Sequence, residues 1–131
     1  MIVSLHVATG AAAGALAGRR RLALALGPLA HLAGDRMPHR DIRSVRFEAL
    51  SGGALILLLA AVRGPFSPAL IGALAASAPD LEHVLPLPRP GGRKLFPSHR
   101  VHGWHRSGGA PASLQLFAAG VLAGVLVRRP R

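Results

Sequence analysis

The chain contains no cysteine and no tyrosine, and among its 131 residues it has one tryptophan and five acidic residues. Without cysteine it can form neither disulfides nor thiolate–metal bonds. A metal ion bound to this chain would have to use imidazole and carboxylate ligands, which suit zinc, iron, nickel and manganese. The groups that can do chemistry are therefore few: seven histidines and five acids.

Positive charge dominates the ionised side chains. Sixteen lysines and arginines against five acids give a net charge of +11. This excess suits anionic lipid headgroups or phosphate-bearing substrates, although a genome biased towards Ala, Arg, Gly and Pro codons would produce it too. Nucleic acid is not expected as a partner, because the arginines are scattered through the loops and no stacking aromatics accompany them. The composition indicates no oligomeric state.

Half of the residues are apolar and 16% are charged, against roughly 25% in a typical soluble domain. The apolar residues form five segments without the alternation of strands, which predicts an all-α fold. We expect a compact bundle of about five short apolar helices, forming a single domain over residues 1–131. The segments are Ile2–Gly18, Leu22–Gly34, 47–62, 68–78 with a continuation to 84, and Pro111–Val127.

The lengths of these segments bear on whether they cross a membrane. A spanning helix needs about 20 apolar residues, with a lower limit of about 17. The first and last segments reach this limit, whereas Leu22–Gly34 is more typical of a buried core helix or a re-entrant segment. We expect a multi-pass membrane protein, with the lipid bilayer as its partner. Gly10, Gly14 and Gly18, spaced four apart, would let its helices pack closely.

An antiparallel order of neighbouring helices predicts where the polar residues gather. The start of the first segment, the loop after the second and the loop before the fifth would then share one side of the bundle. All seven histidines and four of the acids fall on that side, and the other side carries arginines. The residues concerned are His6, His31, His39, His83, His99, His102, His105, Asp35, Asp41, Asp80 and Glu82.

The densest pattern lies at the end of the second segment. His31 and Asp35 are four residues apart and would share one helix face. Pro38 would end the helix and place His39 and Asp41 in the following turn. We expect all four side chains to be metal ligands. The alternative is an ordinary helix C-terminus with a stray histidine and a solvated acid.

A second pattern follows the fourth segment. Asp80 and His83 are three residues apart on one helical face and are expected as further metal ligands. Alternatively, Asp80 follows Pro79 in the first turn of a helix, where a carboxylate favours the helix dipole. His6, in the first segment, is also a candidate ligand, although a histidine there is often a packed or interfacial residue.

A third pattern holds three histidines and the only tryptophan within seven residues, from His99 to His105. We expect His99 and His105 to act catalytically, as proton donors to a leaving group, or as additional ligands. Arg100 would clamp a phosphate oxygen through forked hydrogen bonds. The alternative is a basic loop on a headgroup surface, with Trp104 as an interfacial anchor.

Three motifs stand in one order: a histidine early in the first helix, a Pro-Asp pair after an apolar helix, and His-Arg followed shortly by His and Ser. Here they are His6, Pro79–Asp80, and His99–Arg100 with His105 and Ser107. This combination resembles the small bacterial inner-membrane proteins described as predicted metal-dependent, or LexA-binding, inner-membrane-associated hydrolases. The residues from His31 to Asp41 also resemble zinc phospholipase-C-like proteins. Arg106 departs from the His-Ser pair of the family. The resemblance implies a multi-pass membrane metallohydrolase.

Three functional hypotheses remain open. The first is a membrane-embedded hydrolase in which zinc, or alternatively manganese or iron, activates water against a phosphoester or lipid-like substrate such as an anionic phospholipid. The second is a non-catalytic metal-binding or partner-binding integral membrane protein, which needs no open coordination position. The third is a basic peripheral helix bundle on anionic membranes, which predicts dispersed histidines and no metal.

Overall fold

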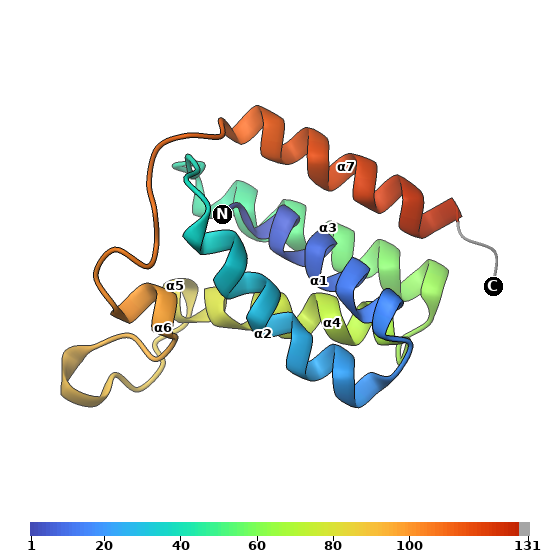
Figure 1. Cartoon of the computed structure of the whole chain (residues 1–131), viewed down its shortest axis with the longest axis horizontal. Coiled ribbons are helices and arrows are strands. Elements are labelled where there is room, and N and C mark those ends of the chain that lie inside the picture. The colour runs from blue at the N-terminus through green and yellow to red at the C-terminus, as the bar shows by residue number, and fades with distance from the viewer. Residues whose placement is uncertain (129–131) are drawn as a thin grey trace.

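The computed structural model describes residues 1–128, so the end of the expected domain, 129–131, lies outside the described range. Within that range there is no strand, and the predicted all-α class is confirmed. Five helices of ten residues or more coincide with the five apolar segments (Figure 1). They are α1 (Val3–Ala17), α2 (Arg20–Arg36), α3 (Val45–Arg63), α4 (Pro68–Ser77) and α7 (Ala112–Arg128). The shorter elements are η1 (Ala78–Asp80), α5 (Leu81–Val84), η2 (Pro90–Gly92) and α6 (Pro97–Arg100).

Local signals in the sequence explain where the helices begin and end. The Ser44 hydroxyl accepts a hydrogen bond from the Phe47 N–H at 3.3 Å and caps α3. Ser67 caps α4 in the same way, and Pro68 occupies the first helical position, where its missing N–H costs nothing. Gly18 ends α1 in the left-handed conformation, with φ of 65°.

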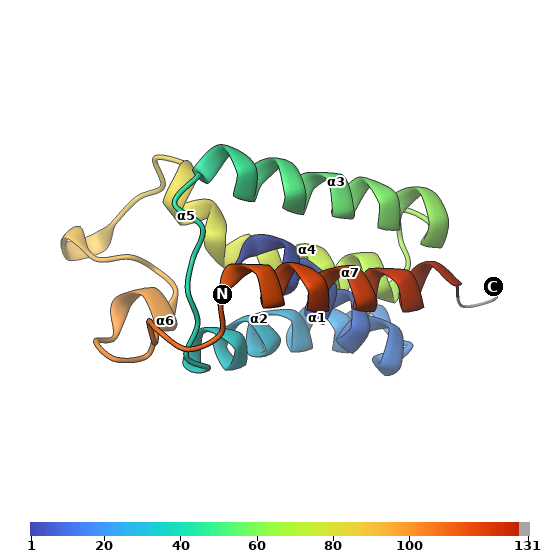
Figure 2. The ribbon, with the colours of Figure 1, turned by 90° about the horizontal axis from the view of Figure 1, so that it is seen from above.

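Helix α1 lies in the middle of the bundle, where it contacts α2, α3, α4 and α7. Helices α2 and α3 lie on opposite sides of it (Figures 1 and 2). Its contact with α4 is close because a Cβ atom on Gly10 or Gly14 would overlap the backbone of Gly72 or Pro68. Two of the three predicted packing glycines are thus confirmed, whereas the third, Gly18, has no neighbour and only terminates the helix.

The helices run up and down, as predicted, so that three distant stretches of chain meet at one end of the bundle (Figure 1). These are the start of α1, the α2–α3 connection (37–44) and the α4–α7 connection (78–111), and we call this end the histidine pole. Backbone hydrogen bonds join the two connections, from the Arg40 N–H to the Ala110 carbonyl at 3.0 Å and from the Ala110 N–H to the Pro38 carbonyl at 3.0 Å. The connections therefore hold one another in place.

The expectation of a multi-pass membrane domain is not supported. Among residues 1–128, only α3 is both long and apolar enough to cross a membrane, and 11% of its most apolar window is buried. Helices α1 and α7 are apolar but shorter, with 15 and 17 residues. At about 1.5 Å per residue, the ten residues of α4 span about 15 Å, half of a bilayer's hydrocarbon core of about 30 Å. Helix α3 is the one candidate span in the described part of the chain.

Candidate metal centre

Asp35 is the centre of the histidine pole. Its side chain, in the last turn of α2, is 1% exposed. Its Oδ2 accepts a hydrogen bond from the Ser98 hydroxyl at 2.6 Å and faces Nε2 of His31 at 3.1 Å. Its Oδ1 accepts from Nε2 of His6 at 3.1 Å. Burial alone would raise the pKa of Asp35, but hydrogen bonds from His105, His31, His6 and His99 outweigh burial and hold this pKa well below its usual range.

The tautomer of His31 follows from a contact on the far side of its ring. Nδ1 of His31 lies 2.7 Å from the carbonyl oxygen of Ala76, which can only accept a hydrogen bond. Nδ1 therefore carries a proton. Nε2 faces the Asp35 carboxylate, to which it donates when the ring holds a second proton, and it offers a lone pair to a cation when the ring is neutral. The imidazole is oriented by a backbone acceptor in the manner of metal-binding histidines.

His99 is oriented by a carboxylate. Its Nδ1 donates to Oε1 of Glu82 at 2.5 Å, so that the lone pair of the neutral ring is on Nε2. That atom lies 3.3 Å from Nε2 of His31 and 3.3 Å from Oδ2 of Asp35. Glu82 is itself fixed, since it accepts the backbone N–H of Leu95 at 2.6 Å. These contacts favour a ligand role for His99 over the proton-donor role suggested by the sequence.

Asp80 completes this group from η1. Its Oδ1 lies 3.9 Å from Nε2 of His31 and 3.8 Å from Nε2 of His99. Its Oδ2 is buried and has no hydrogen-bond partner within the described residues. Burial raises the pKa of Asp80 to about 6, against the opposing attraction of His31 and His99. An unpartnered carboxylate oxygen beside two imidazole lone pairs is an arrangement that a cation would stabilise.

The first ligand group consists of four atoms: Nε2 of His31, Nε2 of His99, Oδ2 of Asp35 and Oδ1 of Asp80. They come from three elements: α2, which carries His31 and Asp35, α6, which carries His99, and η1, which carries Asp80. The separations given above run from 3.1 to 3.9 Å. In a tetrahedral zinc site with bonds of roughly 2.0–2.1 Å, ligand atoms lie about 3.3 Å apart. Ligand atoms of His31, Asp35 and His99 lie within 4.8 Å of one another, so these three residues fit a divalent ion in chemistry and spacing, and Asp80 approaches the same two imidazoles.

A second group lies beside the first. Nε2 of His39 is 3.0 Å from Oδ1 of Asp41 and 3.1 Å from Nε2 of His105. Hydrogen bonds from His105 and His39 hold the pKa of Asp41 below its usual range, although burial opposes this. Hydrogen bonds to Asp35 and Asp41 raise the pKa of His105 to about 9. Both ring nitrogens of His105 thus face carboxylates.

Three further candidates occupy the margin of these groups. His6 stacks on His31 with ring centroids 3.7 Å apart, and its Nδ1 is buried without a partner in residues 1–128. His83 is exposed and lies between His99 and the Lys94 ammonium. Arg100 is exposed and lines an open pocket together with His99. It lies at the rim of the ligand groups.

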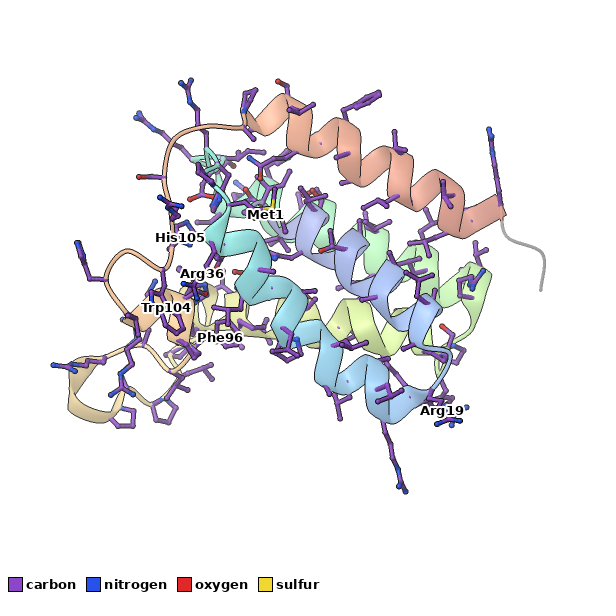
Figure 3. All side chains as sticks on the ribbon, viewed as in Figure 1. Met1, Arg19, Arg36, Phe96, Trp104 and His105 are labelled. Carbon is purple, nitrogen blue, oxygen red and sulfur yellow. The ribbon has the colours of Figure 1, made fainter. Side chains whose placement is uncertain are left out.

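Two residues that hold candidate ligands in place were not among the ligands predicted from the sequence: Glu82, which contacts His99, and Ser98, which contacts Asp35. Glu82 was placed on the correct side but not given the role of holding His99, and Ser98 was not singled out. The signal for Glu82 is its position two residues after Asp80 in a turn that carries both acids. Ser98 shows no signal beyond its position next to His99. The interfacial role considered for Trp104 competes with a packing role, since the Arg36 guanidinium lies 4.7 Å from its ring centroid (Figure 3).

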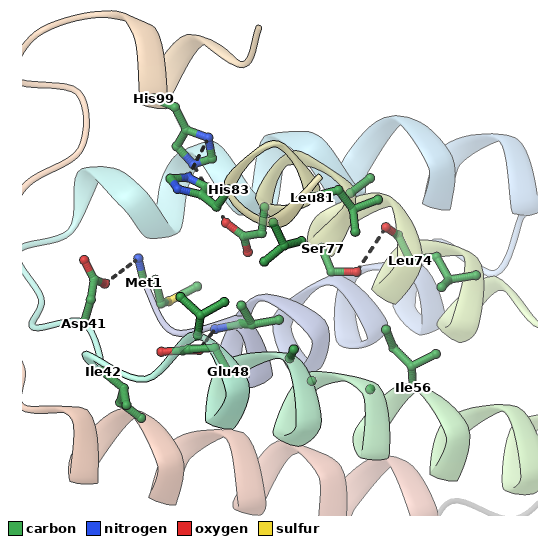
Figure 4. A pocket seen from close by; sticks show the side chains of 18 of the residues that line it. Met1, Asp41, Ile42, Glu48, Ile56, Leu74, Ser77, Leu81, His83 and His99 are labelled. Atoms are coloured by element: carbon green, nitrogen blue, oxygen red, sulfur yellow. Dashed lines mark hydrogen bonds and ion pairs between the residues drawn. The ribbon is translucent and has the colours of Figure 1, made fainter. Parts of the chain in front are cut away.

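A cavity of about 460 Å³ opens beside the ligand groups, between the start of α1, α3 and the α4–α5 region (Figure 4). Its walls are mostly apolar and include Val45, Ile56 and Leu74. At the histidine pole it is lined by Asp41, Asp80, His83, His99 and His105. An apolar space thus ends directly at candidate ligands. In comparisons with known protein families, with curated proteins and with solved structures, nothing matches this chain.

Proposed function

We propose that the protein is a metal-dependent hydrolase of phosphoester, lipid-like substrates, with a divalent ion held by His31, Asp35, Asp80 and His99. One observation carries the proposal. Four electron-rich atoms from separate parts of the chain face one another, and the outer nitrogens of both imidazoles are occupied as proton donors. When the rings are neutral, their lone pairs face carboxylate charges in a buried place, and either a second proton on each ring or a bound cation is needed to relieve the repulsion.

Zinc is the first choice of ion, and manganese or iron are alternatives. The ligands are two imidazoles and two carboxylates at tetrahedral spacing, a set that zinc accepts and that hard ions such as calcium do not favour. A bound ion supplies Lewis-acid chemistry, because it polarises a phosphoryl oxygen and lowers the pKa of a water molecule. The chain's own groups orient the ligands, and Glu82 and the Ala76 carbonyl act on His99 and His31 for this purpose.

The class of substrate is inferred from what surrounds the ligand groups. The cavity offers apolar walls for a hydrocarbon chain and ends at the histidine pole. The neighbouring open pocket is lined by Lys94 and Arg100, whose charges suit an anionic headgroup. An amphiphile with a phosphoester head and an apolar tail matches both features.

Attachment to the inner cell membrane forms part of the proposal. Helix α3 meets the length and composition of a spanning helix, and its Leu50 and Leu57 are 73% and 71% exposed. Helix α7 also presents apolar side chains outwards, including Phe117 at 69%. The family resemblance to inner-membrane hydrolases, which rests on short motifs, points to the same place.

A second candidate function is favoured by the number of ligands. Four protein ligands leave no open position on a tetrahedral ion, which is typical of structural or carrier sites. A non-catalytic metal-binding membrane protein would therefore explain the same geometry. The longer separations of Asp80, 3.8 and 3.9 Å, favour the catalytic alternative, because Asp80 is the ligand most easily exchanged for water.

The test uses the full chain in detergent, loaded with zinc and desalted. We expect bound zinc and hydrolysis of a chromogenic phosphodiester with an alkyl chain, both lost in Asp35→Asn and both kept in His102→Gln, which changes an exposed histidine of the same connection. Bound zinc without hydrolysis of any phosphoester tried would favour the non-catalytic alternative. A wild-type chain that retains no zinc after desalting would refute both metal proposals.

A further inference from the structure

His39, Asp41 and His105 form a group that the first ion does not use. Nε2 of His39 lies 3.0 Å from Oδ1 of Asp41, and Nε2 of His105 lies 3.2 Å from Oδ2 of the same carboxylate. The two Nε2 atoms are 3.1 Å apart. These separations repeat those of the first group and lie close to the edge of a tetrahedral zinc site, about 3.3 Å.

The proton on His39 is fixed on the other side of the ring. Its Nδ1 lies 2.6 Å from the carbonyl oxygen of Met37, which only accepts. When the ring is neutral, Nε2 of His39 therefore presents a lone pair to Asp41, whose carboxylate cannot donate either. A positive group has to meet this pair because His39 is 2% exposed, and in the structure the Met1 ammonium contacts Nε2 of His39 and lies 3.6 Å from Oδ1 of Asp41.

Asp35 links the two groups. Nδ1 of His105 lies 3.5 Å from Oδ2 of Asp35, the oxygen that also faces His31 and His99. The carboxylate is fully buried, whereas Asp41 is 53% exposed and His105 33%. The second group therefore lies between the buried first group and the solvent, at the polar end of the cavity.

We propose that Asp35 bridges two divalent ions, with the second ion held by His39, Asp41 and His105. This inference rests on the proposed function for the first ion. A pair of ions that share a carboxylate clamps a phosphoester from both the attacking and the leaving side, which suits the phosphate end of the substrate proposed above. The competing occupants are positive groups of the chain itself: the amino group of Met1, which lies 2.9 Å from Oδ1 of Asp35 and also contacts His39, and the protonated ring of His105.

The experiment is a count of ions in the full chain, purified in detergent, loaded with zinc, desalted and measured by elemental analysis. We expect two zinc ions per chain in the wild type and in His102→Gln. One ion should remain in the double variant His39→Ala/His105→Ala, and also in Asp41→Asn, whose half-exposed side chain can be changed with little effect on folding. Asp35→Asn should lose affinity for both ions, because it removes the shared ligand.

A second measurement reports on the sharing itself. With manganese in place of zinc, the wild-type chain should give the electron paramagnetic resonance spectrum of a spin-coupled pair, and Asp41→Asn that of an isolated ion. One zinc ion in the wild type, with the same count in Asp41→Asn, would overturn the proposal of a second ion and leave the first ion intact. The positive charge that faces His39 and Asp41 would then be that of the Met1 amino group and the His105 ring. Two ions that survive in the double variant would place the second ion elsewhere and overturn the assignment. No zinc at all would remove the proposed function together with this inference.

Discussion

Glu82 lies 2.5 Å from Nδ1 of His99 through its Oε1, and this contact decides which nitrogen of the imidazole faces Asp35 and Asp80. Because the carboxylate also accepts backbone N–H groups of Leu95 and Phe96, it cannot turn away without losing them. The orientation of His99 is thus set by Glu82, which contacts Nδ1 of the ring and not the candidate ligand atom Nε2.

The first prediction concerns this contact. Glu82→Gln keeps an acceptor for Nδ1 of His99 but removes the negative charge that faces this nitrogen. We expect zinc affinity to fall by about 10–100-fold, as for other outer-shell partners of ligating histidines, with the fold retained. Competition with a chromogenic chelator measures the change. Glu48→Gln is the matched control, because Glu48 also accepts a backbone N–H, that of Val3 at 2.7 Å, but does not contact His99. An unchanged affinity in Glu82→Gln would contradict the positioning role.

The second prediction concerns the close approach of α1 and α4. A Cβ atom at residue 72 would overlap the Gly10 carbonyl and approach the Cα of Gly14. Gly72→Ala should therefore lower the free energy of unfolding by about 1–3 kcal/mol. Gly120→Ala, on α7 with no atom near the new Cβ, should instead be neutral or stabilising by up to about 1 kcal/mol. Thermal melts of the two variants in the same detergent give the comparison, and equal melting temperatures would argue against this packing.

The sequence predicts both the helices and the position of the site, but through different signals. The helices follow from apolar runs bounded by Ser44, Ser67 and Gly18, which are local signals. The histidine pole follows from antiparallel order alone, and it brings His6 and His105 to one carboxylate across 99 positions of sequence. The helices are thus set by local signals and the position of the site by the order of the helices, and neither depends on the detailed arrangement of side chains.

The role of each histidine within the histidine pole could not be predicted in the same way. Whether His99 is a ligand or a proton donor depends on which ring nitrogen Glu82 engages, and this is a matter of rotamers. The composition predicts multiple membrane crossings. In the structure, however, small residues of α2 and α4 lie at contacts between helices: Gly27 packs against α4, and Gly72 packs against α1. Apolar composition does not distinguish such internal packing from lipid exposure.

The third prediction concerns stability with and without metal. Zinc that binds only the folded chain should raise its melting temperature by roughly 10–20 °C, since a free concentration of 1,000 times Kd contributes about 4 kcal/mol. Addition of a chelator should reverse the gain, and excess zinc should restore it. Asp35→Asn should melt at one temperature in both conditions, as followed by circular dichroism. A wild-type chain that is indifferent to the chelator would speak against a folded metal centre.

The fourth prediction concerns the membrane. Leu57 is 71% exposed near the middle of α3, and an arginine there should cost about 2.5–3.5 kcal/mol if α3 crosses a bilayer. Leu57→Arg should therefore reduce recovery of the chain with lipid vesicles in a flotation gradient. Leu95→Arg, at a 52% exposed position in the α4–α7 connection, should float like the wild type. Equal flotation of all three proteins would exclude α3 as the membrane anchor.

The most direct measurement of the central claim is zinc K-edge X-ray absorption on the loaded, desalted wild-type chain. The account predicts a low-coordinate zinc ion with nitrogen and oxygen neighbours and clear multiple scattering from imidazole rings, which disappears in Asp35→Asn. A spectrum of hydrated zinc without imidazole scattering, the same in both proteins, would contradict it.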